Sequence, residues 1–147
     1  RSRPPEQSRG RREVLCAHTD RSYPVPSFFI PDVLQLLAGL GLLNVWLLRP
    51  RSATSYRGGE AQTLKEEFAA YGLPAAGLYV VGALKITAAL MFIAGIWLPL
   101  PVEIAAGVVA LLMVGALAMH AKVKDPMLRS LPAALMLMMT LGILLLR

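Results

Sequence analysis

The stretch that decides the fold is AAGLYVVGALKITAALMFIAGIWL, residues 75–98. Its only charged side chain is Lys85, which interrupts an otherwise apolar run. A helix that crosses a membrane needs about 17–25 predominantly apolar residues. The stretch therefore predicts a transmembrane helix that carries one charge inside the span.

Three further apolar stretches predict spans at residues 27–48, 102–121 and 131–146, the last of them short for a full crossing. The chain is 56% hydrophobic, whereas soluble proteins are about 45–50% apolar even with glycine counted. The connection WLPLP (97–101) has room only for a tight turn, so spans two and three are antiparallel neighbours. We predict one all-α membrane domain at residues 27–147, a four-helix bundle with an up-down-up-down path.

The one substantial loop, residues 49–74, contains a second kind of pattern. Leu64, Phe68 and Tyr71 recur at helical spacing, while Lys65 and its acidic neighbours lie off that stripe. This pattern predicts a short amphipathic helix that lies in the membrane interface. The alternative is a plain surface helix that does no more than cover the bundle.

The first 26 residues are rich in arginine and contribute to a net charge of +6. We predict that residues 1–26 form a disordered basic tail. Contact with anionic lipid headgroups explains such a tail better than nucleic acid does, so no nucleic-acid partner is expected. Cys16 is the single cysteine, which excludes a CxxC redox pair or a disulfide within one chain.

Lys85 lies ten residues into its span, about 15 Å from the end of the bundle where the 49–74 loop lies. A lysine at the centre of a span costs roughly 2.5–3.5 kcal/mol, so a partner is expected. The up-down path brings the other polar candidates to that same end of the bundle. The predicted intramembrane polar site contains Lys85, His120, Asn44, Asp125, Glu66 and Glu67.

Two interpretations of this cluster remain open. Lys85 either snorkels to a loop carboxylate as a structural tie, or it belongs to a binding or proton-handling site. No group of histidine and cysteine residues suggests a metal site, and we assign no catalytic residue. The methionines of the last span are interpreted as packing or lipid-facing side chains.

Four segments of the chain resemble the DoxX-like family of small four-helix membrane proteins. They are EEFAAYGLP (66–74), GALKITAALMFIAGIW (82–97), MVGALAMHAKVKDP (113–126) and LPAALML (131–137). The resemblance extends over roughly residues 33–146. It implies a four-helix membrane fold, located in most relatives in the bacterial inner membrane. The family takes its name from a subunit associated with a thiosulfate:quinone oxidoreductase, and some relatives are linked to redox stress.

The resemblance brings no agreed catalytic residues, and the chain has no recognisable cofactor motif. The leading hypothesis is therefore an accessory or assembly subunit of a membrane complex, with a membrane-protein partner or a second copy of itself. The first alternative is a quinone-linked oxidoreductase subunit, in which Lys85 and His120 hydrogen-bond quinone carbonyls. The second alternative is a small-solute carrier. Quinone is the one cofactor that these hypotheses name, and the sequence leaves open whether the protein is an enzyme.

Overall fold

The computed structural model describes residues 29–147, so the predictions for the 1–26 tail and for Cys16 lie outside the described part. This part is entirely helical and has no strand. Its elements are α2 (Phe29–Leu43), which continues as the π-helix η1 (Asn44–Leu48), α3 (Leu64–Ala70), α4 (Ala75–Ala94), α5 (Val102–Lys122) and α6 (Met127–Leu146). The predicted all-α fold is confirmed.

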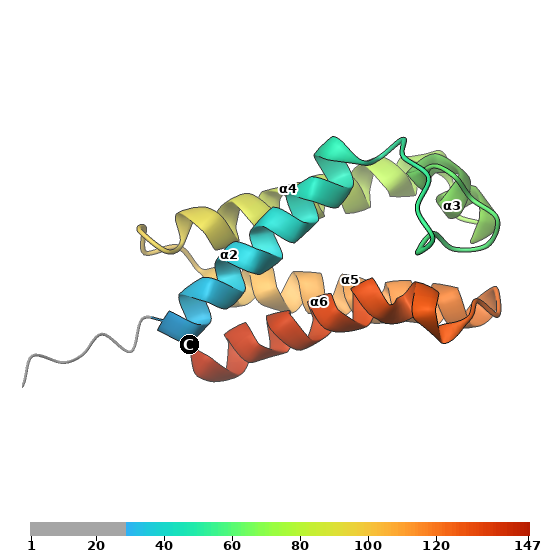
Figure 1. Ribbon diagram of the computed structural model, residues 1–147. Coiled ribbons are helices and arrows are strands. Elements are labelled where there is room, and N and C mark those ends of the chain that lie inside the picture. The colour runs from blue at the N-terminus through green and yellow to red at the C-terminus, as the bar shows by residue number, and fades with distance from the viewer. Residues whose placement is uncertain (1–28) are drawn as a thin grey trace, which may run out of the picture.

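The four long helices form two layers (Figure 1). One layer contains α2 and α4, and the other contains α5 and α6. Each long helix packs against two neighbours, α2 against α4 and α6, and α5 against α4 and α6. The 49–74 loop and α3 close one end of the bundle, whereas the chain's last residues lie beside the start of α2 at the other end. This is the predicted up-down-up-down bundle.

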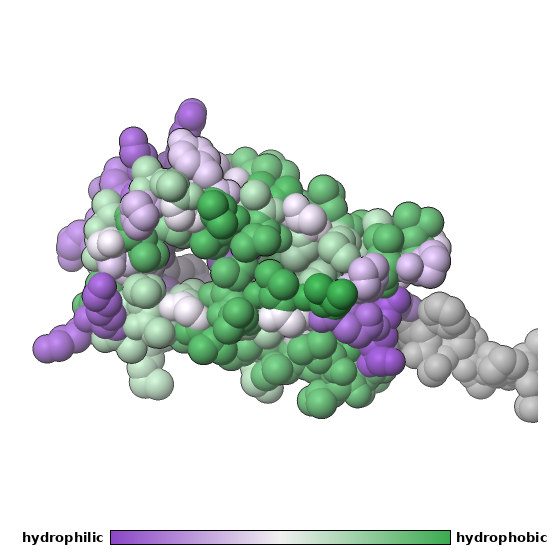
Figure 2. Space-filling view, turned by 180° about the vertical axis from the view of Figure 1, so that it is seen from behind, coloured by the Kyte–Doolittle hydropathy of each residue, from purple (hydrophilic) through white to green (hydrophobic). Residues whose placement is uncertain are grey.

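The outer surface of the bundle is built for lipid. The segments Ile30–Leu48, Ala75–Ala94, Val102–Lys122 and Met127–Leu146 are all long and apolar enough to cross a membrane. Large apolar side chains such as Leu84, Leu111 and Leu135 point outward, which a water-soluble surface of this size rarely tolerates. Figure 2 shows a broad apolar band between two hydrophilic ends. The protein is an integral membrane protein.

Two helix ends differ from the predicted bounds of the spans. α4 ends at Ala94, four residues before the predicted end of the second span at residue 98. α6 begins at Met127, not near residue 131, and its 20 residues are long enough for a full crossing. Arg129 and Ser130 interrupt the apolar run in the sequence, which made the span look short. Pro132 lies inside the helix, as transmembrane helices allow when neighbouring groups satisfy the freed carbonyl.

The predicted short helix in the first loop is present as α3. Its first turn is capped by Thr63, whose hydroxyl accepts a hydrogen bond from the Glu66 backbone N–H. Leu64, Phe68 and Tyr71 are all buried. This apolar stripe faces the bundle, so α3 forms a roof over one end of the four helices.

The well-packed core occupies the half of the bundle away from α3. Its fully buried members include Ala89, Phe92, Val109 and Ile143. These residues come from the end of α4, the first half of α5 and the end of α6. The half beneath α3 lacks such a filled core, and this difference positions the candidate site.

Candidate functional site

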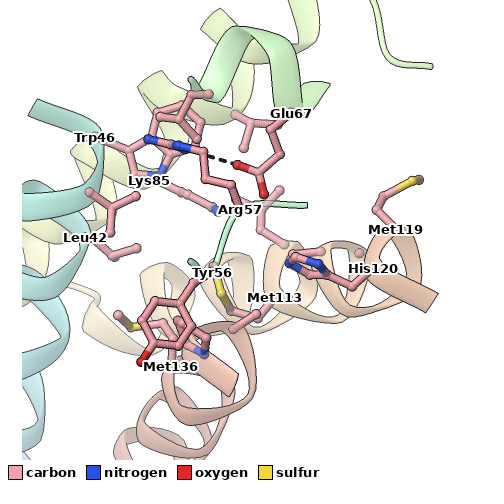
Figure 3. A pocket seen from close by; sticks show the side chains of 18 of the residues that line it. Leu42, Trp46, Tyr56, Arg57, Glu67, Lys85, Met113, Met119, His120 and Met136 are labelled. Atoms are coloured by element: carbon pink, nitrogen blue, oxygen red, sulfur yellow. Dashed lines mark hydrogen bonds and ion pairs between the residues drawn. The ribbon is translucent and has the colours of Figure 1, made fainter. Parts of the chain in front are cut away.

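A cavity of about 500 Å³ lies between the four helices and beneath α3. Its walls are largely apolar and include Leu42, Leu112, Met113 and Met136. Nearly all of its polar lining comes from the α3 end, where the loop and the helix ends meet (Figure 3). Figure 2 shows a hollow in the apolar face near that hydrophilic end. An apolar cavity with a few polar groups at one end is an arrangement typical of small-molecule sites.

Lys85 of α4 lines this cavity. Its Nζ lies 5.1 Å from the centroid of the Trp46 ring, a cation–π contact. Within residues 29–147 the ammonium forms no ion pair and no hydrogen bond. The structural tie to a loop carboxylate, one of the two interpretations left open by the sequence, is therefore not formed among these residues.

Trp46 holds its place because of a glycine on the facing helix. A Cβ atom at Gly82 would lie 2.8 Å from the Trp46 ring, so only glycine lets the indole lie against α4 at this level. The other side of the indole meets Phe68 edge-on, with ring centroids 6.3 Å apart. The spacing Gly82-x-x-Lys85 thus places the ring and the ammonium together at the wall of the cavity. The π-helix η1 carries Trp46 inward, and such segments often occur at functional sites.

Two groups of polar side chains close the α3 end of the cavity, and together they are called the polar roof. The first group is the buried ion pair between Arg57 and Glu67. Arg57 Nη1 lies 3.2 Å from Glu67 Oε2, and both side chains are shielded from solvent. The guanidinium also donates to the backbone carbonyls of Arg49 and Ser52. Glu67 Oε1 accepts a 2.9 Å hydrogen bond from the Gly58 N–H. These bonds fold the 49–59 loop back onto α3.

The second half of the roof is centred on Asp125, whose side chain is only 3% exposed. His120 Nδ1 lies 2.8 Å from Asp125 Oδ2, and an ionised carboxylate only accepts, so Nδ1 carries the proton. The other oxygen accepts from the Gly59 N–H at 2.9 Å and from Arg129 at 3.0 Å. Burial by itself raises the pKa of Asp125, but these hydrogen bonds outweigh it and hold the pKa below its ordinary value.

Tyr71 joins the two halves. Its hydroxyl donates to Glu67 Oε1 at 3.0 Å and lies 3.4 Å from His120 Nε2. Burial, followed by the nearby Glu67 carboxylate, raises the pKa of Tyr71, so the phenol stays protonated. A Cβ atom at Gly58 would overlap the Tyr71 hydroxyl, which explains a glycine at that position. The result is a continuous polar network between the 49–74 loop, α5 and the start of α6.

The structure brings together most of the predicted site residues. Lys85, Asn44, His120 and Glu67 line the cavity, and Asp125 joins them through His120. Glu66 does not line the cavity. Its side chain turns away and accepts a hydrogen bond from the Gln62 N–H, because it caps the start of α3.

Sequence reasoning missed four participants: Trp46, Arg57, Tyr71 and Arg129. The four-residue spacing between Asp125 and Arg129 was a usable signal, since such pairs face each other at a helix start. Tyr71 lies on the predicted apolar stripe of α3, and the stripe gives no sign that its hydroxyl also contacts a carboxylate and an imidazole. Nothing local in the turn-rich loop sets Arg57 apart from its basic neighbours.

The comparisons with known proteins agree with this architecture. Searches of the curated proteins and of the solved structures found no match to the chain. The sequence profile of the DoxX-like family matches residues 53–142, more than half of the chain. The matched region contains the roof, α4, α5 and most of α6, and with them Lys85, His120 and Asp125. The chain therefore belongs to the DoxX-like family.

Proposed function

We propose that this protein is an accessory subunit of a redox complex in the bacterial cell membrane, and that its cavity binds a membrane-dissolved molecule of the quinone class. The observation that carries the proposal is the cavity of about 500 Å³, which is apolar along its walls and polar at one end. Small-molecule sites typically have volumes of about 300–1,000 Å³ and only a few polar groups.

The chemistry of the polar end suits a quinone ring. Quinone carbonyls accept hydrogen bonds, and the Lys85 ammonium is a donor with no other hydrogen-bond acceptor among residues 29–147. The exposed Asn44 amide lines the same end and is a second donor. The isoprenoid tail of a quinone is apolar and matches the leucine and methionine walls, and it can leave through the side of the bundle into lipid.

An accessory role suits the polar groups of the roof better than catalysis does. Glu67, Tyr71, His120 and Asp125 are bonded to one another and to the loop backbone, so they hold the roof in place. A carrier would need a route to both membrane faces, whereas the half of the bundle away from α3 is filled by the core. The complex partner, another membrane protein or a second copy, is to be identified by copurification.

Binding is measurable through Trp46, which lies at the cavity wall. The second tryptophan, Trp97, is exposed in the turn between α4 and α5, so Trp97→Phe leaves a single reporter. In lipid nanodiscs, a short-chain ubiquinone or menaquinone analogue should quench Trp46 fluorescence in a saturable manner. Quenching that rises linearly with the quinone concentration would contradict binding in the cavity. Such quenching is expected for a free indole in bilayers that lack the protein.

Two glycines of α5 supply a matched pair of variants. Gly115 lines the cavity and Gly107 does not, and a Cβ atom at either would meet nothing within 4 Å. Gly115→Phe places a ring at the cavity and should weaken quinone binding about tenfold or more, a cost of about 1.4 kcal/mol. Gly107→Phe should leave the affinity unchanged. Equal effects of the two substitutions would show that the quinone binds elsewhere.

A further inference from the structure

The charges that line the cavity are unevenly balanced. Four lining residues are basic, namely Arg49, Arg57, Lys85 and Arg129, and one is acidic, Glu67. Arg57 is neutralised by Glu67, and Arg129 by Asp125, which lies behind the wall. Arg49 lies just beyond the end of η1 and is exposed, so Lys85 carries the one charge at the wall that lies within a span and has no ion-pair partner among the described residues.

Neither carboxylate of the roof is free to neutralise that charge. Glu67 is bound by Arg57, by the Gly58 N–H and by the Tyr71 hydroxyl. Asp125 is likewise occupied by His120, Arg129 and the Gly59 N–H. If either carboxylate turned toward Lys85, it would leave a buried guanidinium or imidazole without its partner. That arrangement costs more free energy than the observed one, in which Lys85 is unpaired.

Packing also places the ammonium at the wall of the cavity. It lies against the Trp46 ring, and that ring is held between Gly82 and Phe68. The Lys85 side chain is therefore presented to the cavity by packing that the ligand does not have to create. An unpaired cation on a largely apolar wall within a membrane span favours an anion strongly, because the low local dielectric strengthens their attraction.

We propose that the ligand of this cavity has a head group with one negative charge shared between oxygen atoms, and that this head group pairs with Lys85. The proposal rests on the proposed function and specifies its ligand class. Acidic hydroxyquinones and fatty carboxylates share this chemistry, with an anionic oxygen head and an apolar tail. The head lies beside Lys85 and within reach of the Asn44 amide, and the tail lies along Met113 and Met136.

The test compares two probes that share the naphthoquinone ring and the alkyl tail and differ at one oxygen, which is ionised in one probe and methylated in the other. A 2-hydroxy-3-alkyl-1,4-naphthoquinone is an anion at neutral pH, and its 2-methoxy ether is neutral. Both are titrated into nanodiscs that contain the Trp97→Phe protein, and concentrations are expressed per lipid. The affinity of the protein for the hydroxy compound should exceed its affinity for the ether by about tenfold or more. Dodecanoate should displace it, whereas dodecanol should not.

Substitution of the lysine assigns the preference to its charge. Lys85→Met should reduce the affinity for the hydroxy compound about tenfold more than it reduces that for the ether, which loses only a hydrogen bond to a carbonyl. Lys85→Arg should retain the preference. The matched control is Lys65→Met, which removes the same charge from the exposed side of α3, outside the cavity. Circular dichroism establishes that each variant is folded, and Lys85→Gln is the second variant if the methionine variant is not.

The outcomes separate this inference from the function on which it rests. If both naphthoquinones bind with equal affinity, or if Lys85→Met weakens both alike, the anionic head group is wrong while quinone binding stands. Displacement by dodecanol as effective as that by dodecanoate would also overturn it. If neither naphthoquinone nor a neutral quinone quenches Trp46 saturably, the proposed function itself fails.

Discussion

Replacement of Asp125 by alanine is expected to destabilise the protein by about 3–5 kcal/mol, the largest effect of any single substitution in the roof. The carboxylate is buried and accepts from His120, Arg129 and the Gly59 N–H at once. Alanine leaves the imidazole and the backbone N–H without an acceptor. Thermal denaturation in a mild detergent, followed by circular dichroism, measures the loss.

The control removes a carboxylate from the same part of the molecule without breaking any of these bonds. Glu60 is exposed in the 49–74 loop, and Glu60→Ala should change the stability by less than about 0.5 kcal/mol. The loss of stability for Asp125→Asn should lie between these two values, because the amide oxygen still accepts hydrogen bonds but the charge is lost. A loss for Asp125→Ala as small as that for Glu60→Ala would show that the roof does not depend on this carboxylate.

The same residue predicts a pH dependence. The pKa of Asp125 is lower in the folded protein than in the unfolded chain, so its contribution is fully present above the unfolded value of about 3.9. The contribution is lost as the pH falls through the lower folded value. The stability difference between the wild type and Asp125→Asn should therefore persist from about pH 7 down to pH 5 and should shrink below about pH 4. A difference that vanishes already at pH 6 would contradict this assignment.

The second large effect is expected at Glu67. Glu67→Gln keeps an acceptor for Gly58 and Tyr71 but removes the charge that neutralises Arg57, whose side chain is 6% exposed. A buried charge left without its partner typically costs about 3–5 kcal/mol. We expect a loss toward the lower end of that range, because Arg57 keeps its hydrogen bonds to two backbone carbonyls.

A double-mutant cycle isolates the pair. Arg57→Met together with Glu67→Gln should cost less than the sum of the two single substitutions, with a coupling energy of about 1–3 kcal/mol. Additive losses would mean that the two side chains do not interact in the membrane. Hydrogen exchange of the 57–71 amides should rise in Glu67→Gln and fall back partly in the double variant.

The sequence predicted the bundle well because membrane helices obey a simple rule. Each span must satisfy its backbone internally and present apolar side chains to lipid, so its length and composition reveal it. The rule was least accurate at two helix ends: α4 ends at Ala94 and not at residue 98, and Arg129 and Ser130 hid the start of α6 at Met127. Arg129 is accommodated there because it pairs with Asp125, a contact that the apolar pattern does not contain.

The site was predicted less completely, for reasons that are also physical. The position of each residue along its helix predicted that Lys85, Asn44 and His120 lie at one end of the bundle. The structure places all three around one cavity. Which carboxylate bonds to which partner depends on the path of the 49–59 loop, and no periodicity encodes that path. A tie from Lys85 to a loop carboxylate is one of the two interpretations that the sequence leaves open, but the roof occupies the nearby carboxylates and Lys85 lies on Trp46.

The measurement that tests the central claim most directly is mass spectrometry of the small molecules that copurify with the protein in native lipid nanodiscs. Wild type and Gly115→Phe should be extracted with organic solvent side by side, with Gly107→Phe as the control. The cavity predicts an amphiphile with an acidic oxygen head that is retained by wild type and by Gly107→Phe and is depleted in Gly115→Phe. An identical set of bulk lipids in all three extracts would contradict a ligand in this cavity.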